Sequence, residues 1–481
     1  MKTCFVVTLP AAAASDPAAF ARRARGAGAD LLELRGDLTP GLAPFESPLP
    51  LLLAPRGGDL TRLAARGAAW LDLERGERGP PCPGAERLGS FHDPAGCPDA
   101  ATLIEIGRAL RLEGASALKL VVRPDCAADW LELERARAPL AALAPTTLLA
   151  MGPLADGSRL FSPWRNPFTY AALEPGLESA PGQWTLAEHL ALAGPEPPAL
   201  TGLLGGAEFT AKSLSPRIHG LLARRRGLRA VYLRFPSREA GPDLAALLAL
   251  GLRGLSVTAP HKLAAAAAAA SLDAAAREAG AVNTLLRDER PGGAVWRGLQ
   301  LDAEGLRRGY ADWRGAESLA LLGSGGAAAA VLLAARELDW RGATIFARSA
   351  EPAAALARRF GARARPLAEL PSSRADLLVS SLPVDLPVPL GPPGSGLPQP
   401  LGPDPRAIDL RYGAATGFQR AAADRGFRVR DGLAMLLHQA LAQFEQFHGV
   451  QTDAADLAAL EAELAEFRRP NGSNARPDHR P

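Results

Sequence analysis

Lysine is scarce in this chain of 481 residues. Among its 54 lysines and arginines only four are lysine, at positions 2, 119, 212 and 262. Arginine serves equally well on a solvated surface, but it stays protonated at any usable pH. A buried lysine can instead give up its proton and act as a nucleophile or a proton donor. Lysine is therefore expected mainly where arginine cannot replace it.

Other features are missing as well. The four cysteines all lie within the first 126 residues and show no spacing that suits zinc, so neither a metal centre nor cysteine redox chemistry is expected. No apolar run reaches about 18 residues, which excludes a predicted membrane span, and the first residues lack the pattern of a signal peptide. A net charge of +3 argues against a dedicated nucleic-acid binder. We therefore expect a cytoplasmic protein with small-molecule partners; its oligomeric state stays open.

The first 195 residues alternate short apolar runs with helical patterns. Eight such units predict an α/β fold that begins with a (β/α)₈ TIM barrel, whose active site lies at the carboxyl ends of the strands. The predicted strands are 4–9, 30–35, 50–55, 70–75, 87–93, 117–124, 146–152 and 168–173.

The remaining chain is too long to join one compact core with this barrel. The Pro-rich segment 193–200 is typical of a linker, and further strand–helix units follow it. The predicted domains are a barrel over 1–195, a domain over 198–310 that helices in 432–467 complete, a dinucleotide-binding Rossmann domain over 311–431, and a disordered tail over 470–481.

Lys119 interrupts a run, "GASALKLVVRPD" (114–125), that otherwise predicts a strand buried on both faces. It can point outward and extend its ammonium to water, or it can serve as an amine. An isolated buried ammonium costs several kcal/mol. Desolvation by Leu118, Leu120 and the barrel wall would favour the free amine, which condenses with a ketone to give a Schiff base.

Charged side chains gather near the ends of the other predicted strands. Glu33 and Arg35 share one face of a strand, as do Asp72 and Glu74. Each alone suits a salt bridge or an exposed rim position, but together they favour an active site. Further charged or titratable residues at the same rim are Arg56, His92 and Arg159.

This set predicts a β-elimination of water from a hydroxylated keto acid. An iminium on Lys119 acidifies the adjacent C–H bond. His92 is suited to remove that proton and return it to the departing hydroxyl, while Glu74 orients the imidazole. The arginines would clamp a carboxylate and hydroxyl groups.

Six short motifs occur in the order found in type I 3-dehydroquinate dehydratase: "ELR" (33–35), "LDLE" (71–74), "SFHD" (90–93), "ALKL" (117–120), "MGPLADGSR" (151–159) and "APGQ" (180–183). The chain resembles that family over residues 4–192. The resemblance implies a Schiff base on Lys119, with His92 and Glu74 as its catalytic partners. The substrate contacts that it implies are Glu33, Arg35, Arg56, Arg159 and Gln183.

The second half presents polar residues at the starts of predicted helices. Ser213 and Ser215 can either cap a helix or bind a carboxylate. "GLSVTAPHK" (254–262) brings Thr258 and Lys262 out of a buried strand. Asn283, in "GAVNT", and Asp302, in "GLQLDAEG", follow.

A glycine-rich turn, "GSGGAA" (323–328), stands between a predicted strand and a helix, where a dinucleotide-binding loop belongs. Glycine lets backbone amides approach a pyrophosphate at the helix N-terminus. The next predicted strand ends in Arg348 and Ser349 and not in an acid, which favours a 2′-phosphate and hence NADP.

These blocks, with "DGLAMLLHQALAQFEQFHG" (431–449), resemble shikimate dehydrogenase over residues 198–467. The resemblance implies that Lys262 and Asp302 form the catalytic pair. The substrate contacts that it implies are Ser213, Ser215, Thr258, Asn283, Tyr412 and Gln439. The implied NADP contacts are Gly323, Ser324, Gly325, Gly326, Ala327, Ala347, Arg348, Ser349 and Gly432. The family's Asn-Thr before the catalytic aspartate is Gln300-Leu301 here.

The two resemblances fit consecutive steps of the shikimate pathway of aromatic biosynthesis. The first enzyme makes 3-dehydroshikimate and the second reduces it with NADPH, so we expect one bifunctional enzyme. An alternative keeps the dehydrogenase with quinate as its substrate. Another makes the barrel a non-catalytic scaffold or ligand sensor, which the complete Lys119, His92 and Glu74 set argues against.

Overall fold

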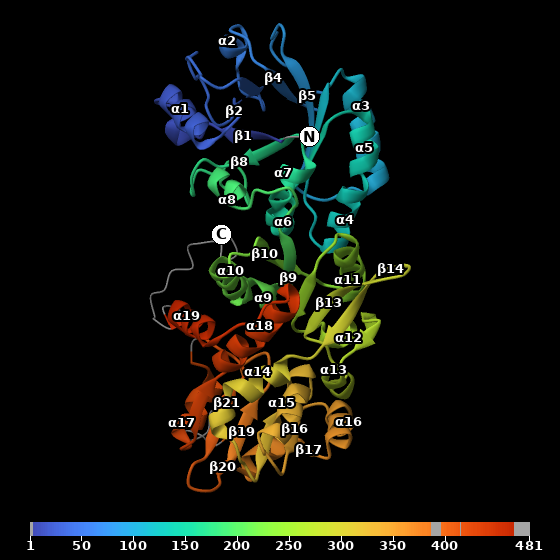
Figure 1. Ribbon diagram of the computed structural model, residues 1–481, viewed down its shortest axis with the longest axis vertical. Coiled ribbons are helices and arrows are strands. Elements are labelled where there is room, and N and C mark those ends of the chain that lie inside the picture. Colours follow the sequence, from blue (N-terminus) through green and yellow to red (C-terminus); the bar gives the residue numbers. More distant parts are fainter. Residues whose placement is uncertain (1–2, 386–395, 414, 466–481) are drawn as a thin grey trace. The chain divides into compact units, whose positions relative to one another are not determined.

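The computed structural model describes residues 3–385, 396–413 and 415–465, which form two compact units (Figure 1). The first holds the chain up to residue 199 together with 233–251. The second holds 200–232 and the described chain from 252 onward. The predicted tail 470–481 lies outside the described residues, and the predicted domain bounds stay a prediction. Within the described residues, no helix is long and apolar enough to cross a membrane.

The first unit is built on a parallel sheet of eight strands, in the order β7-β6-β5-β4-β3-β2-β1-β8. This confirms the predicted barrel, since every predicted strand is present. The strands are β1 (Cys4–Thr8), β2 (Leu31–Arg35), β3 (Leu51–Ala54), β4 (Trp70–Glu74), β5 (Glu86–Asp93), β6 (Ala117–Val122), β7 (Thr146–Ala150) and β8 (Phe168–Ala171).

Side chains bridge β7 and β8, for which the described residues show no backbone ladder. The amide of Asn166 donates to the Leu148 carbonyl at 3.0 Å and accepts from the Leu148 N–H at 3.2 Å. The Thr147 hydroxyl accepts from the Phe168 N–H at 3.3 Å. The barrel is thus nearly closed, and one of the four asparagines of the chain satisfies backbone groups at its seam.

Helices surround this sheet in chain order. α11 belongs to the same unit: Asp243 on it accepts a hydrogen bond at 3.1 Å from the Ala128 N–H in the first turn of α4. The helices of at least six residues are α1 (Pro17–Ala27), α3 (Ala100–Leu112), α4 (Ala127–Arg135), α5 (Arg137–Leu143), α6 (Ala155–Leu160), α8 (Leu186–Ala191) and α11 (Ala240–Ala249). Shorter ones are η1 (Ala11–Ala13), α2 (Thr61–Ala64), η2 (Gly152–Leu154) and α7 (Ser162–Arg165).

The second unit begins with a mixed sheet, in which β9, β11, β13, β14 and β12 lie in that order. Its strands are β9 (Ala199–Gly205), β11 (Gly254–Val257), β12 (Ser271–Leu272), β13 (Thr284–Arg290) and β14 (Gly293–Leu299); β10 (Ala230–Pro236) precedes α11. The helices are α9 (Ala207–Ala211), α10 (Ser215–Arg225), α12 (Lys262–Ala268), α13 (Ala274–Ala279), α14 (Asp302–Gly309) and η3 (Ala311–Trp313).

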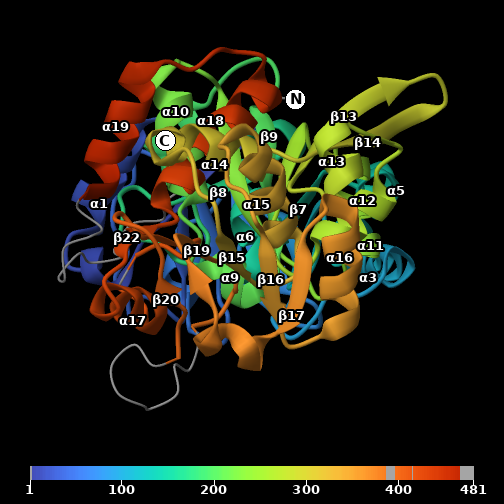
Figure 2. The same ribbon diagram turned by 90° about the horizontal axis from the view of Figure 1, so that it is seen from below.

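A parallel sheet with the order β17-β16-β15-β19-β21-β22 completes this unit. Numbered along the chain, the order is 3-2-1-4-5-6, that of a Rossmann domain, as predicted. Figure 2 shows α16 beside the β17 edge and α17 beside the β22 edge. The strands are β15 (Leu319–Leu322), β16 (Thr344–Ala347), β17 (Arg363–Pro366), β19 (Leu377–Ser380), β21 (Arg406–Asp409) and β22 (Arg428–Asp431), with the short pair β18 (Arg374–Ala375) and β20 (Gln399–Pro400).

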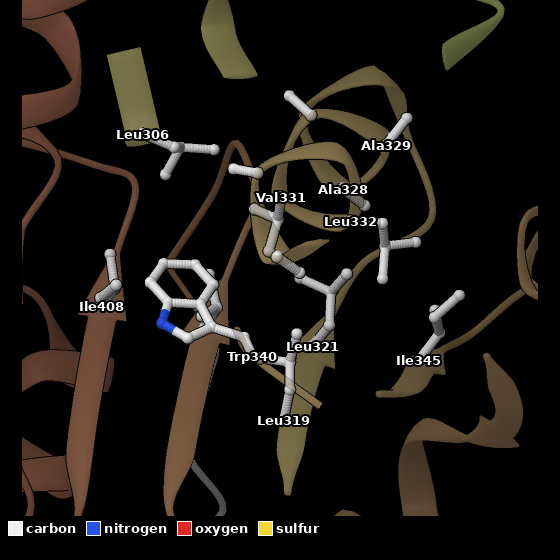
Figure 3. Packing of buried hydrophobic residues seen from close by; sticks show 14 of the residues in the cluster. Leu306, Leu319, Leu321, Ala328, Ala329, Val331, Leu332, Trp340, Ile345 and Ile408 are labelled. Carbon is white, nitrogen blue, oxygen red and sulfur yellow. The ribbon is translucent and has the colours of Figure 1, made fainter. Parts of the chain in front are cut away.

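The helices of this part are α15 (Gly326–Glu337), α16 (Ala350–Phe360), η4 (Leu367–Ser372), α17 (Gly417–Asp424), α18 (Leu433–His448) and α19 (Ala454–Ala465). Figure 3 shows how α15 packs: Val331 and Leu332 face Leu319 and Leu321 of β15. The small residues of "GAAAAV" allow this close approach to the sheet. The N-terminus of α15 is thereby held at the carboxyl end of β15, where Rossmann domains bind their ligand.

Two candidate active sites

Lys119 points into the barrel from the middle of β6, and its side chain is only 8% exposed. Strand alternation places it on the same face as Ala117 and Val121, which belong to the inner apolar cluster. Leu118 and Leu120, to which the sequence assigned its desolvation, therefore point to the opposite face. The snorkelling alternative is wrong, because the ammonium is buried.

Carboxylates surround the Lys119 amine. Its Nζ donates to Asp72 Oδ2 at 3.0 Å and lies 3.8 Å from Glu33 Oε1. The ring of Tyr170 on β8 packs under it, with 4.1 Å from Nζ to the ring centroid. A cation–π contact and two acids thus compensate the burial of the charge.

Arg56 binds two acids of β4. Its guanidinium donates to Asp72 at 2.8 Å and to Glu74 at 2.9 Å. Arg56 also adopts a positive φ of 49°, a conformation rare outside glycine. Strain of this kind is held by surrounding contacts and clusters at functional sites. The arginine predicted to clamp substrate therefore also orders the carboxylates of the site.

His92, at the end of β5, forms a pair with Glu74 of the neighbouring strand. Its Nδ1 lies 2.7 Å from Glu74 Oε2, and its backbone N–H donates to Glu74 Oε1 at 2.8 Å. Because an ionised carboxylate only accepts hydrogen bonds, Nδ1 carries the proton and Nε2 is the atom that can take another. This is the arrangement that a general base requires.

The charge states follow from the same contacts. Burial raises the pKa of Glu74, but its hydrogen bond with His92 and the charge of Arg56 outweigh burial and lower it below its ordinary value. Burial lowers the pKa of His92 below 6.5, and the charges of Lys119 and Arg56 lower it further, although the hydrogen bond that His92 donates to Glu74 opposes this shift. At neutral pH the pair is therefore a carboxylate beside a neutral imidazole.

Three predicted residues of the first site remain: Gln183, Arg35 and Arg159. Gln183 accepts from the Ser179 N–H at 2.8 Å, and the Ser179 hydroxyl reaches Thr8, whose own hydroxyl donates to Glu33 at 2.6 Å. This chain of contacts brings Gln183 to the Lys119 cluster. Arg35 pairs with Asp37 at 2.6 Å, and Arg159 is buried in α6, the helix that follows β7.

The second site contains a lysine–aspartate pair, as predicted. Lys262, the first residue of α12, donates to Asp302, the first residue of α14, at 2.5 Å. Asn283 donates to the other carboxylate oxygen at 2.7 Å. Gln300, which replaces the family's asparagine, accepts from the Asp302 N–H at 2.9 Å. Asn283 thus holds the carboxylate and Gln300 holds its backbone, so that the carboxylate can in turn fix the lysine amine.

A buried amide, Gln443 of α18, organises the rest of this site. It donates to Thr284 Oγ1 at 2.7 Å and to the Asn283 carbonyl at 3.1 Å, and it accepts from Gln439 at 2.6 Å. The predicted substrate residues Asn283 and Gln439 are thus joined through it. No sequence reasoning had singled out Gln443; its place one helical turn after Gln439 is the available signal.

The remaining predicted contacts lie in the same unit. The hydroxyls of Ser213 and Ser215 are 3.1 Å apart at the start of α10, and the Ser215 N–H also reaches Ser213. Thr258 directly follows β11, and Tyr412 follows β21. Their part in binding stays a prediction.

The glycine turn lies beside the lysine–aspartate pair. A Cβ added at Gly326 would stand 3.4 Å from Lys262 Cδ, whereas one at Gly325 would meet nothing within 4 Å. Gly323 has a positive φ of 103°, and a Cβ on Gly432 would collide with the Leu410 carbonyl. The open space at Gly325, at the N-terminus of α15, fits a dinucleotide phosphate. Arg348 and Ser349 are exposed after β16, where they could meet a 2′-phosphate.

The sequence placed Asp72 beside Glu74 but assigned it no role, and it did not single out Ser90 or Tyr170. All three are buried in the first site. Strand alternation alone gave the signal for Asp72, since it shares the face of Glu74. Ser90 and Tyr170 carried no comparable signal, because only the packing of neighbouring strands brings them to Lys119.

Both halves of the chain are similar to known proteins. Residues 59–192 match the type I 3-dehydroquinase family, and residues 207–285 match the shikimate dehydrogenase substrate binding domain. The shikimate dehydrogenase (NADP(+)) of Hyphomonas neptunium is 37% identical over 279 residues, which are 56% of this chain and 98% of that protein. The one from Mesorhizobium japonicum is 36% identical over 261 residues, 52% of this chain and 91% of its own length.

Two solved structures are similar to this chain, one to part of it and one to nearly all of it. Shikimate 5-dehydrogenase from Thermus thermophilus, in complex with NADP(H) and shikimate, is 30% identical with a TM-score of 0.46 and covers 55% of this chain and 99% of its own. The dehydroquinate dehydratase and shikimate dehydrogenase of S. pombe is 21% identical with a TM-score of 0.43, over 96% of this chain and 98% of its own.

Proposed function

Because this chain belongs to the shikimate dehydrogenase family and carries a type I 3-dehydroquinase ahead of it, we propose that its two lysine sites catalyse consecutive reactions. The chain is bifunctional: it dehydrates 3-dehydroquinate to 3-dehydroshikimate and reduces that product to shikimate with NADP as cofactor. We assign the first reaction to Lys119, His92 and Glu74, and the second to Lys262 and Asp302.

The observation that carries the first assignment is the buried Lys119 amine inside the barrel, with the His92–Glu74 pair on the neighbouring strands β5 and β4. Lys119 condenses with the ketone of 3-dehydroquinate, and the resulting iminium acidifies the adjacent carbon. His92 takes the proton through Nε2 and returns it to the leaving hydroxyl, while Glu74 fixes the ring through Nδ1. Arg35, Arg56, Arg159, Glu33 and Gln183 are proposed to bind the carboxylate and hydroxyl groups.

For the second assignment the supporting observation is the Lys262–Asp302 pair beside the glycine turn. Bound NADPH supplies the hydride. Lys262 donates a proton to the ketone oxygen as that oxygen gains negative charge, and Asp302 positions the amine. Ser213, Ser215, Thr258, Asn283, Tyr412 and Gln439 are proposed to orient the substrate.

The test supplies the purified chain with 3-dehydroquinate, first alone and then with NADPH. We expect 3-dehydroshikimate in the first step and oxidation of NADPH in the second. Borohydride added with the substrate should trap a covalent adduct on the barrel half. Formation of no 3-dehydroshikimate and no adduct would remove the dehydratase assignment and favour a scaffold or sensor role. Faster turnover of quinate than of shikimate in the reverse direction would change the assigned substrate.

The pH dependence of dehydration follows from the His92–Glu74 pair. His92 must be neutral to accept a proton, and its pKa is lowered from 6.5 mainly by burial. We therefore expect kcat/KM to fall as the pH drops, with an apparent pKa below 6.5. Glu74→Gln keeps an oxygen that can accept from Nδ1 but removes the carboxylate charge that raises this pKa, so the acid limb should move to still lower pH while kcat falls. A limb above pH 6.5, or one that Glu74→Gln moves upward, would contradict the assignment of the base.

Coenzyme choice gives a separate prediction. Arg348 is exposed directly after β16, and its guanidinium suits a phosphate dianion. We expect Arg348→Ala to raise KM for NADPH by about tenfold or more, the loss of one charge-assisted phosphate contact, and to leave KM for NADH nearly unchanged. Arg358→Ala, on the following helix α16, is the matched control and should leave both values unchanged. Equal effects on both coenzymes would remove Arg348 from the 2′-phosphate site.

A further inference from the structure

Asp72 is the acid nearest to the reacting nitrogen of Lys119. Its carboxylate has no exposed surface and receives hydrogen bonds from three groups: Lys119 at 3.0 Å, Arg56 at 2.8 Å and Ser90 at 2.6 Å. Burial raises its pKa, but the charges of Lys119 and Arg56 outweigh burial and lower it to about 2. Asp72 is therefore a fixed negative charge that faces the reactive amine.

The net reaction at Lys119 conserves positive charge. A protonated amine and a ketone give an iminium and water: the N–C bond forms, the carbonyl C–O bond breaks, and two ammonium protons leave on the oxygen. One positive charge stands at Nζ before and after this step. A carboxylate placed for the ammonium is thus also placed for the iminium, with no need for reorganisation.

The other groups around Nζ are less suited to this task. Glu33 is farther from it, at 3.8 Å, and already accepts a short hydrogen bond from Thr8. Glu74 is engaged with His92 and Arg56. Tyr170 contributes the face of its ring on another side of the amine. Among the acids that the structure describes, Asp72 is the one that accepts a hydrogen bond from Nζ.

We propose that Asp72 is the counter-ion of the iminium that Lys119 forms with the substrate, and that the ring face of Tyr170 completes this cation site. The inference rests on the dehydratase function proposed above. When His92 removes the neighbouring carbon's proton, the C–H electron pair becomes a C=C bond and the C=N pair returns to nitrogen. Asp72 then keeps its pairing with Arg56, so the carboxylate stays compensated while the nitrogen is neutral.

Asp72→Asn tests the proposal, since it keeps the shape and removes the charge. We expect kcat of dehydration to fall about 100-fold, as for the loss of a preorganised charge in a buried site. The fraction of chain trapped by borohydride with 3-dehydroquinate should also fall severalfold. Asp72→Glu restores the charge and should recover at least about tenfold of the lost kcat. The proposal would be overturned if Asp72→Asn had the same kcat of dehydration and the same fraction trapped by borohydride as the native chain.

Glu134→Gln is the matched control for loss of a buried acid. Glu134 is largely buried on α4 and pairs with Arg137 and Arg165, in contacts that do not include Lys119. Glu134→Gln should change kcat of dehydration by less than about threefold. A loss of kcat equal to that of Asp72→Asn would overturn the counter-ion role. Absence of adduct in the native chain would instead defeat the proposed function itself, so the two failures are distinguishable.

Two further variants keep the test decisive if Asp72→Asn fails to fold. Ser90→Ala removes one hydrogen bond to Asp72 and leaves its charge, and we expect kcat to fall about three- to tenfold. Tyr170→Phe keeps the ring and should be tolerated, whereas Tyr170→Leu should lower the trapped fraction. Unchanged kcat in Ser90→Ala together with equal trapping in both Tyr170 variants would overturn the proposal.

Discussion

Replacing Lys119 by arginine is expected to abolish dehydration while NADPH-dependent reduction continues in the same chain. Arginine keeps the positive charge that Asp72 and Glu33 compensate, but its guanidinium does not condense with a ketone. The loss should be at least about 10⁴-fold in kcat, as for removal of a covalent nucleophile. The measurement is the initial rate of 3-dehydroshikimate formation, with adduct trapping by borohydride as a second readout.

Lys119→Met is the companion variant. It removes the positive charge as well as the amine, so that comparison with Lys119→Arg separates the effect of the charge on stability from the loss of the nucleophile. It leaves Asp72 with Arg56 as its charged partner, so we expect a lower melting temperature than in the arginine variant. Both should be equally inactive in dehydration. Residual dehydration above about 1% of the native rate in Lys119→Arg would exclude a Schiff base as the route.

The strands of the barrel could be predicted from the sequence because each one is a short apolar run between polar segments. The observed strands differ from the predicted ones by no more than two residues at either end. Alternation along one strand also placed Asp72 and Glu74 on one face. These are local properties, and local patterns of apolar residues are sufficient to specify them.

Apolar patterns along the chain could not predict which residues of adjacent strands lie next to each other. Lys119 meets Asp72 because β4, β5 and β6 pair in a register that sets Glu74 opposite Ser90 and Ser90 opposite Lys119. Alternation says nothing about that register. The sequence therefore identified the amine but surrounded it with leucines, whereas the structure surrounds it with acids.

Helical segments show the same limit. The resemblance to shikimate dehydrogenase pointed to Gln439, yet the amide that joins Gln439 to Asn283 is Gln443, one turn later. Gln443 also forms hydrogen bonds with Ser256 and Thr284, which come from strands far away in the sequence. A buried polar group of this kind is specified by the partners that satisfy it, and these become visible only in the fold.

Replacing Lys262 by methionine is expected to stop reduction of 3-dehydroshikimate while dehydration continues. The ketone oxygen gains negative charge as hydride arrives, and removal of the proton donor should lower kcat by about 10³-fold. Asp302→Asn should lower kcat less, because Asn283 still donates to the side-chain oxygen and Gln300 still accepts from the backbone N–H. Lys212→Met, a change of an exposed lysine in the same unit, is the matched control and should leave kcat within about twofold.

The comparison of kcat with coenzyme binding decides what Lys262 does. Lys262 Cδ approaches the glycine turn at Gly326, so a purely structural role would disturb NADPH binding as well as turnover. A proton donor predicts instead that Kd for NADPH, measured by fluorescence titration, stays within about threefold while kcat collapses. Parallel losses in both quantities would assign Lys262 to shaping the coenzyme loop. Loss of kcat alone would assign Lys262 to proton donation and not to shaping the coenzyme loop.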